Sequence, residues 1–330
     1  MSSARPFSPL ETPYLAPRGA EPARITLGTM NFGKRTSAAD SARIMARALE
    51  RGVALFDTAN VYNDGESERL VGRAVAGRRE AVLVATKVGL GRAGGKAEGL
   101  SRAVIAGAIE QSLSRLATDY VDVYYLHAPD PATPIEETID AVAEQIAKGR
   151  VRHLGVSNFA SWQILEVDRL CDERGMERPR ISQVMYNLLI RQVEIEYLRF
   201  ARKYPIHTTV YNPLAGGLLT DRYQVGDSVA SGSRFDKNKL YQKRYWSERM
   251  LELVQSYRAL AAEAQMAVVD LAYAWLANAV GVDSILVGPG SVEHLDAALD
   301  AVTRPVSPEL RDKARALHEA FTGTDASYAR

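Results

Sequence analysis

The chain has 330 residues, 46% of them hydrophobic and 25% charged, with 41 lysines and arginines against 40 aspartates and glutamates. The hydrophobic content is high enough for a substantial buried core. The net charge of +1 argues against a protein built to follow nucleic-acid phosphates. The single Cys171 excludes a disulfide framework, and no apolar stretch reaches the roughly 18 residues of a membrane span. We therefore expect a cytoplasmic protein without a nucleic-acid or membrane partner.

Residues 1–23 differ in composition from the rest of the chain. They contain five prolines and no apolar run, so they do not predict a secretory signal. We interpret them as a flexible tail, and residues 24–330 as one domain.

From Arg24 onward, short β-rich runs alternate with longer stretches of helical spacing. Alternating strands and helices predict a parallel sheet, because parallel neighbours need a crossover connection. Eight repeats over about 300 residues fit a closed (β/α)8 TIM barrel better than an open sheet. The expected strands are the runs 24–30, 54–60, 81–87, 121–128, 152–158, 181–187, 207–213 and 283–288.

Several helices carry a start signal. Ser37 with Asp40, Ser101, and Thr133 before Pro134 are typical of helix N-caps. The longest irregular stretch, about 221–240, follows the seventh expected strand. Such a long loop in a compact domain is typical of a lid or binding segment. C-terminal helices complete the expected fold.

Polar residues end nearly every expected strand. In a barrel these ends meet at one mouth, where the chemistry of such folds lies. We therefore expect one carboxylate, one ammonium, one imidazole and several amides to converge there, from Asp57, Asn60, Lys87, His127, Ser157, Asn158, Gln183, Asn187, the segment 211–213 and Gly288.

Other chemistries find little support. Residues 89–94 match G-x-G-x-x-G, but the next helix is expected only near Ser101, so we interpret them as a flexible active-site loop. The five histidines form no metal-binding pair, and we predict no metal site. The sequence has no G-x-S-x-G elbow, and Cys171 lies in a helical run typical of a buried residue.

Asp57, Tyr62, Lys87 and His127 form a set that could protonate a developing oxyanion. A tyrosine phenol titrates near 10. An adjacent Lys87 would lower the pKa of Tyr62, and Asp57 would keep Lys87 charged. His127 would orient a carbonyl oxygen against the phenol. The alternative is that Tyr62 lies on an exposed loop and Lys87 merely ends a strand.

The chain also resembles the aldo-keto reductase superfamily, and most closely its aflatoxin-aldehyde reductase branch. The resemblance runs from about Ile25 to the C-terminus, through the motifs LGTMNFG, DTANVYNDGESE, ATK, YYLHAPD, GVSNF, QVMYN and YNPLAGGLLT. It implies reduction of aldehydes or ketones to alcohols with NADPH. It further implies a homodimer and small aldehyde substrates, some with a carboxylate or a second carbonyl group.

The resemblance implies a role for each member of the catalytic set. Tyr62 supplies the proton, and Lys87 with Asp57 tunes Tyr62. His127 orients the substrate carbonyl.

A second set is implied to bind the cofactor. Ser157, Asn158 and Gln183 hold the carboxamide, and the Tyr211 ring stacks on the nicotinamide. The other implied cofactor residues are Gly28, Thr29, Met30, Asp57, Asn212, Pro213, Leu214, Ala215, Gly216, Gly217, Leu218, Leu219, Arg222, Arg234, Gly288, Gly290, Ser291 and His294.

Two of these regions are implied to bind the phosphates of the cofactor. Residues 212–222 wrap the pyrophosphate with flexible glycines and the charge of Arg222, and Arg234 grips the adenosine 2′-phosphate. The family usually has arginine or glutamine in place of His294 and asparagine in place of Ala298. The sequence therefore leaves open whether the protein also uses NADH in addition to NADPH.

Tyr241, Arg244 and Arg330 match positions that contact substrate in this branch. The two arginines would bind a substrate carboxylate, because a guanidinium fits that group; as an alternative they are ordinary surface charges. Two other functions remain open, a dedicated biosynthetic ketoreductase, for example on a deoxysugar, and a slow cofactor-binding regulatory subunit of the potassium-channel β kind.

Overall fold

Eight parallel strands close into a barrel in the order β1-β10-β9-β8-β7-β6-β3-β2. The structure is a computed structural model that describes residues 24–93 and 96–324. All eight expected strands are present, which confirms the TIM barrel. They are β1 (Ile25–Gly28), β2 (Leu55–Asp57), β3 (Leu83–Val88), β6 (Val121–Leu126), β7 (Val151–Ser157), β8 (Ile181–Met185), β9 (His207–Tyr211) and β10 (Ser284–Val287).

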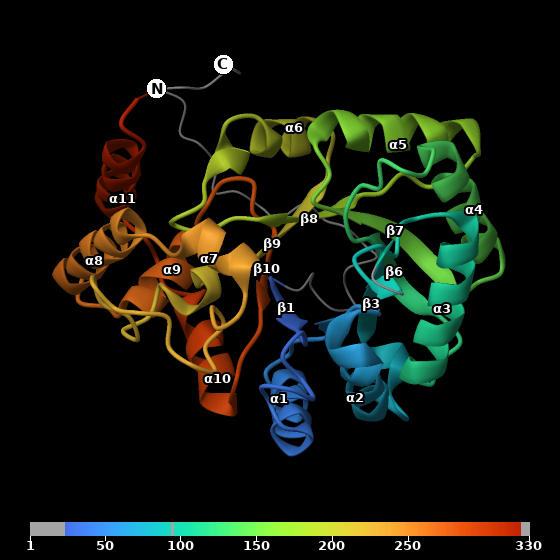
Figure 1. The fold of residues 1–330 in the computed structure, drawn as a ribbon, viewed down its shortest axis with the longest axis horizontal. Coiled ribbons are helices and arrows are strands. Elements are labelled where there is room, and N and C mark those ends of the chain that lie inside the picture. The colour runs from blue at the N-terminus through green and yellow to red at the C-terminus, as the bar shows by residue number, and fades with distance from the viewer. Residues whose placement is uncertain (1–23, 94–95, 325–330) are drawn as a thin grey trace.

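Helices surround the barrel, and α7, α8 and α11 gather on one side of it (Figure 1). Among them, α8 and α11 pack against each other. The helices are α1 (Ala38–Glu50), α2 (Glu66–Val75), α3 (Arg102–Leu116), α4 (Ile135–Ala147), α5 (Ser161–Glu173), α6 (Tyr197–Lys203), α7 (Lys239–Tyr245), α8 (Glu248–Glu263), α9 (Val268–Ala277), α10 (Val292–Ala301) and α11 (Pro308–Thr322). The predicted tail at 1–23 and Arg330 lie outside the described residues.

The barrel interior contains a small apolar cluster, separate from the larger core between strands and helices. It consists of Leu55, Leu83, Ala85, Val123, Tyr125 and Ile181. Side chains alternate along a strand, so residues two positions further on also point inward. This alternation places Asp57, Lys87, His127 and Gln183 in the layer directly above the cluster, at the carboxyl ends of the strands.

Two of the predicted helix caps are confirmed and one is wrong. Ser37 caps α1, and its hydroxyl accepts a hydrogen bond from the backbone N–H of Asp40 at 3.1 Å. Ser101 takes the N-cap position of α3 as predicted, but its side chain makes no capping hydrogen bond, and the backbone N–H of Arg102 donates to Glu137 Oε1 at 2.8 Å. The N-cap of α4 is Pro134 rather than Thr133, because the Thr133 hydroxyl donates to Asp130 instead.

The described part of the glycine-rich segment after β3, residues 89–93, forms no phosphate-binding turn. The backbone N–H groups of Gly89 and Gly91 donate to Glu98 Oε2, at 2.8 and 2.9 Å. A short hairpin of β4 (Arg92–Ala93) and β5 (Lys96–Ala97) follows, and the next helix starts only at Arg102. A carboxylate therefore takes the donors that a phosphate would need, and it fixes the base of the segment predicted to be a flexible loop.

The long stretch after β9 is irregular up to α7, which begins at Lys239, within the predicted loop. Aromatic side chains hold this stretch in place. Phe235 is fully buried, and its ring centroid lies 5.7 Å from that of Tyr223 and 4.9 Å from that of Trp246. The stretch is thus anchored to the start of α8 beside the mouth of the barrel.

Candidate active site

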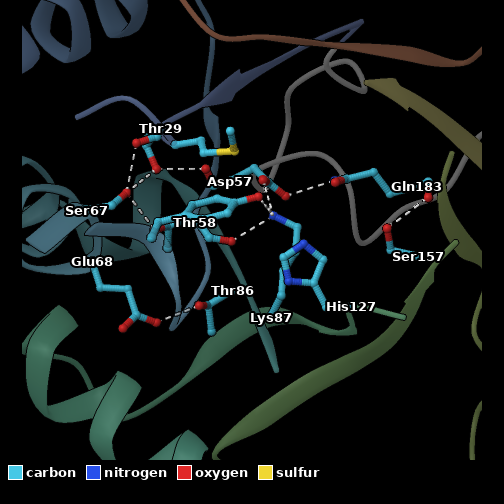
Figure 2. A network of polar contacts seen from close by, with 12 residues as sticks. Thr29, Asp57, Thr58, Ser67, Glu68, Thr86, Lys87, His127, Ser157 and Gln183 are labelled. Atoms are coloured by element: carbon cyan, nitrogen blue, oxygen red, sulfur yellow. Dashed lines mark hydrogen bonds and ion pairs between the residues drawn. The ribbon is translucent and has the colours of Figure 1, made fainter. Parts of the chain in front are cut away.

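Lys87 and Asp57 form an ion pair at the floor of the barrel mouth (Figure 2). Both side chains are buried, with 0% and 1% exposure. Lys87 Nζ also donates to the carbonyl of Thr58 at 2.8 Å, and Gln183 Nε2 donates to Asp57 Oδ2 at 3.0 Å. Burial lowers the pKa of Lys87 and raises that of Asp57, and the charge of each partner limits the other's shift.

Tyr62 begins the short 3-10 turn η2 (Tyr62–Gly65) after β2, and it is partly buried. Lys87 Nζ donates to its hydroxyl at 3.5 Å and lies 5.1 Å from the ring centroid. The exposed-loop alternative is therefore not supported. The prediction that Lys87 lowers the pKa of Tyr62 is wrong: burial, together with the charge of Asp57, raises that pKa well above its usual value.

His127 follows β6 and faces Tyr62 edge-on, with ring centroids 5.9 Å apart and an interplanar angle of 76°. Burial, and then the charge of Lys87, lower the pKa of His127 well below its usual value. The imidazole is therefore neutral at pH 7. Its Nδ1 is buried and has no hydrogen-bond partner among the described residues.

A cluster of three hydroxyl groups, which the sequence did not predict, lies behind the ion pair. Ser67 Oγ lies 2.7 Å from Thr29 Oγ1 and 2.8 Å from Thr58 Oγ1 (Figure 2). All three side chains are fully buried. The cluster joins the ends of β1 and β2 to α2, and it holds the Thr58 carbonyl that accepts from Lys87. Small polar residues directly after two buried strands are the signal that could have revealed it.

Glu68 is a second buried carboxylate near Lys87. It accepts from Thr86 Oγ1 at 2.6 Å (Figure 2). It also forms a salt bridge of 2.5 Å with Arg115. Its charge raises the pKa of Lys87. Nothing in the sequence alone distinguished this glutamate from the solvated charges around it on α2.

The four residues predicted to hold and stack on a nicotinamide come together at the ends of β7, β8 and β9. Ser157 Oγ donates to the carbonyl of Gln183 at 3.0 Å. Tyr211 OH donates to Asn158 Oδ1 at 2.7 Å, and Asn158 Nδ2 donates to the carbonyl of His127 at 2.9 Å. Both ends of the Asn158 amide are thus already bonded, which makes it a spacer between Tyr211 and His127.

The segment after β9 folds as a tight turn. Asn212, Ala215 and the two glycines that follow have positive φ, with Gly216 at 71° and Gly217 at 102°. A Cβ at Gly216 would lie 3.1 Å from the Tyr241 ring. The side chains that the turn buries are Pro213, Ala215, Leu218 and Leu219, whereas Arg222 is exposed. A cofactor would therefore meet mainly backbone here.

The residues after β1 and at the start of α10 that were predicted to bind the cofactor differ in how far their polar groups are already bonded within the protein. The Thr29 hydroxyl is committed to the hydroxyl cluster and to the carbonyl of Asp57, at 2.9 Å. Its backbone is also bonded, because the N–H donates to the Asp57 carbonyl at 3.0 Å and the carbonyl accepts from Phe32 and Ser67. Ser291 caps α10 and accepts from the backbone N–H of His294 at 3.3 Å. Glu293 lies in the same first turn, and a hydrogen bond from Ser291 lowers its pKa. Ala298 is fully buried.

Arg234 contacts two residues that follow β1 and one residue of α7. It donates to Asn31 Oδ1 at 2.9 Å, to Met30 Sδ at 3.3 Å and to Tyr241 OH at 3.4 Å. Its charge acts on Tyr62, opposing the rise in pKa. The Arg244 guanidinium lies 5.8 Å from the ring centroid of Tyr241.

Other kinds of site are not apparent in the part of the chain that the structure describes. No group of three histidine, cysteine, aspartate or glutamate side chains there is placed to hold a metal ion. Cys171 is fully buried, as predicted, and burial raises its pKa to about 12. Within residues 24–93 and 96–324, no single helix could span a membrane; α8 and α9 pass on length and composition only as a pair bent by 86°.

Residues 24–318 match the family model described as Aldo/keto reductase family. The chain belongs to the aldo/keto reductase family. It is 35% identical over 325 residues to aflatoxin B1 aldehyde reductase member 2 of Homo sapiens, a match covering 92% of this chain and 89% of the relative. The human aldo-keto reductase family 7 member A3 is 35% identical over 312 residues, covering 89% and 92%.

A relative of a different kind is the probable voltage-gated potassium channel subunit beta of Arabidopsis thaliana. It is 32% identical over 295 residues, covering 87% of this chain and 90% of that protein. Membership of the family and the aldehyde reductase relatives support carbonyl reduction by an oxidoreductase that uses a nicotinamide cofactor.

Proposed function

We propose that this protein reduces aldehydes and ketones to alcohols with NADPH, and that Tyr62 is the general acid. The buried chain from Asp57 through Lys87 to the Tyr62 hydroxyl carries this proposal. A phenol with a raised pKa keeps its proton at neutral pH, and the ammonium beside it stabilises the phenolate that proton transfer leaves behind.

The bound reduced nicotinamide supplies the hydride. Tyr62 donates its phenolic proton to the substrate carbonyl oxygen as negative charge develops there. Asp57 and the Thr58 carbonyl hold Lys87 beneath the phenol oxygen, at 3.5 Å. Removing Asp57 or Lys87 would leave the other as a buried charge without its partner.

His127 orients the carbonyl. A neutral imidazole has one N–H donor and one acceptor nitrogen. A buried N–H without a partner is rarer than a buried unpaired acceptor, so Nδ1 is assigned the lone pair and Nε2 the proton. Nε2–H then donates to the substrate oxygen together with the Tyr62 hydroxyl.

The residues at the mouth fit a nicotinamide. Gln183, Ser157 and the flat ring of Tyr211 offer the donors, acceptors and stacking face that the group needs. The positive-φ turn at 215–217 lets backbone approach a pyrophosphate closely. At α10 the ionised Glu293 opposes an additional phosphate. NADPH remains our proposal for the main cofactor, with NADH use possible beside it.

We infer that the substrates are small aldehydes, including some that carry a carboxylate. Arg234 and Arg244 both lie near the Tyr241 ring, and the charges of Arg234 and Tyr241 act on Tyr62. Arg234 has no carboxylate partner among the described residues. A guanidinium so placed suits a substrate carboxylate. Arg330 remains a predicted contributor.

The test is consumption of NADPH, and separately of NADH, by purified protein with 2-carboxybenzaldehyde, succinic semialdehyde and a plain ketone. Tyr62→Phe should lower turnover by about 100-fold or more, in line with loss of a general acid. Tyr124→Phe is the matched control, because the Tyr124 hydroxyl is buried on β6 without a partner among the described residues. Equal turnover in the two variants would refute the role of Tyr62.

The same panel separates the alternatives. Turnover restricted to one specialised ketone would indicate a dedicated ketoreductase. Tight cofactor binding with negligible turnover on every carbonyl would indicate a regulatory subunit, as the name of the Arabidopsis relative suggests for that protein. A cytoplasmic homodimer remains our prediction, to be checked by light scattering.

A further inference from the structure

Asn212 occupies a strained position at the start of the turn after β9. Its φ is 65°, in the left-handed region that asparagine tolerates better than most residues. It follows Tyr211 directly, the ring proposed to stack on the nicotinamide. The conformation of Asn212 therefore sets both the direction of the Tyr211 ring and the entry into the turn at 213–217.

Two buried side chains hold Asn212 from behind. Asn187 Nδ2 donates to the carbonyl of Asn212 at 3.0 Å, and Asn212 Nδ2 donates to Tyr245 OH at 3.1 Å. Asn187 Nδ2 also donates to Tyr245 OH at 3.3 Å, which closes a triangle of hydrogen bonds. The network therefore fixes both the backbone and the side chain of Asn212.

The remaining polar atoms of the triangle are also bonded. Asn187 Oδ1 accepts from the backbone N–H groups of Leu189 and Ile190, both at 3.0 Å. The Tyr245 hydroxyl donates to Met185 Sδ at 3.4 Å. Asn212 Oδ1 accepts from Tyr241 OH at 3.4 Å. Each side-chain nitrogen and oxygen atom of Asn187, Asn212 and Tyr245 therefore has a partner, and a buried network of this kind favours one geometry.

Neither Asn187 nor Tyr245 can touch a ligand in this arrangement. Both side chains are fully buried. Together they join the end of β8, the end of β9 and α7, the helix that carries Tyr241 and Arg244. The network thus links the proposed cofactor turn to the helix that borders the substrate side.

We propose that Tyr245 and Asn187 are positioning residues for the cofactor, which fix Asn212 and, through it, the Tyr211 ring and the turn at 213–217. This inference rests on the proposed function, because it assumes that a nicotinamide dinucleotide binds at this mouth. It assigns these two residues no part in proton transfer.

The experiment measures the dissociation constant of NADPH by isothermal titration calorimetry, without substrate. Tyr245→Phe removes only the hydroxyl and should raise Kd roughly tenfold, the size expected for loss of a buried hydrogen bond. Asn187→Asp keeps the acceptor toward Leu189 and Ile190 but sets a carboxylate oxygen against the Asn212 carbonyl. It should raise Kd at least as much.

Tyr257→Phe is the matched control. Tyr257 is also fully buried, and its hydroxyl donates to the carbonyl of Leu188 at 3.0 Å, but not to Asn212. It should lower the melting temperature as much as Tyr245→Phe while leaving Kd unchanged. In saturating NADPH, kcat of Tyr245→Phe should stay within about twofold of the wild type while KM for NADPH rises.

The outcomes separate the two proposals. If wild-type protein does not bind NADPH, the proposed function fails. If it binds and Tyr245→Phe and Asn187→Asp bind equally well, the positioning role fails. The same conclusion holds if Tyr257→Phe weakens binding as much as Tyr245→Phe, or if both test variants fail to fold, because the network would then be purely structural.

Discussion

The Tyr62 phenol keeps its proton over a wide pH range, because burial and the charge of Asp57 raise its pKa. His127 stays neutral over the same range, because burial lowers its pKa. Both groups are therefore in the form that reduction needs from about pH 6 to 8, and we expect kcat/KM for reduction to be constant there. At alkaline pH the rate should fall as Lys87 loses its proton, below the pH usual for lysine.

The reverse reaction has the opposite requirement. Oxidation of an alcohol needs ionised Tyr62, so its rate should rise with pH through the same window. Steady-state rates in both directions between pH 5 and 10 check the two profiles. A reduction rate that halves near pH 7 would mean that a different group supplies the proton.

Asp168 gives a stability prediction away from the active site. The residue is 7% exposed, burial raises the pKa of its carboxyl to about 6, and Oδ1 has no hydrogen-bond partner among the described residues. The folded chain therefore binds more protons than the unfolded chain between about pH 4 and 6. Stability falls as pH rises through that window, and the deficit persists above it.

Asp168→Asn should remove this deficit. We expect the free energy of unfolding to rise by about 1 kcal/mol at pH 8, less than the whole shift implies because solvent retains partial access. At pH 4 the variant and the wild type should be equally stable. Urea unfolding at the two pH values measures both, and a gain at pH 4 that matches the gain at pH 8 would disprove the titration argument.

For single residues, the sequence predicted which side chains lie at the candidate site, but not the hydrogen-bond partners and burial of those side chains. Asp57, Lys87 and His127 follow from the alternation of strand side chains, because inward positions end each strand. The pKa of Tyr62 was predicted with the wrong sign, because the sequence shows that a lysine is near but not how much water is displaced. The commitment of Thr29 to Ser67 depends on a helix that approaches from elsewhere.

Between elements, the contact of α2 with α3 depends on Gly72. A Cβ at this position would lie 2.4 Å from the carbonyl oxygen of Leu116. Gly72→Ala should therefore lower the free energy of unfolding by about 1–3 kcal/mol, because backbone atoms must move apart. Thermal unfolding measures the change.

Gly107 on α3 is the matched control. A Cβ at Gly107 would meet no atom within 4 Å. Gly107→Ala should be neutral or stabilising by up to about 1 kcal/mol, since alanine favours helix. Similar losses in both variants would show that close packing is not the reason for Gly72.

The strands and helix starts could be predicted where neighbouring residues in the sequence determine them. All eight strands and the caps at Ser37 and Ser101 follow from short runs of sequence. The cap of α4 did not, because Thr133 finds a competing acceptor in Asp130. The anchoring of the 221–240 stretch by Phe235 depends on aromatic residues distant in sequence, which no local pattern shows.

Over the whole molecule, the closed barrel brings the ends of β2, β3, β6, β7, β8 and β9 to one mouth. This closure is why polar residues spread over more than 150 positions, from Asp57 to Tyr211, can act as one site. The contacts of Arg234 with Met30 and Tyr241 also depend on the fold, because these residues lie far apart in the sequence or on another element.

The most direct test of the account is transfer of label from cofactor to product. NADPH deuterated at both C4 positions is incubated with the protein and 2-carboxybenzaldehyde, and the alcohol is analysed by mass spectrometry. We predict one deuterium on the carbinol carbon with wild-type protein and at least about 100-fold less product with Tyr62→Phe. Unlabelled alcohol, or full activity of the variant, would contradict hydride transfer with Tyr62 as the acid.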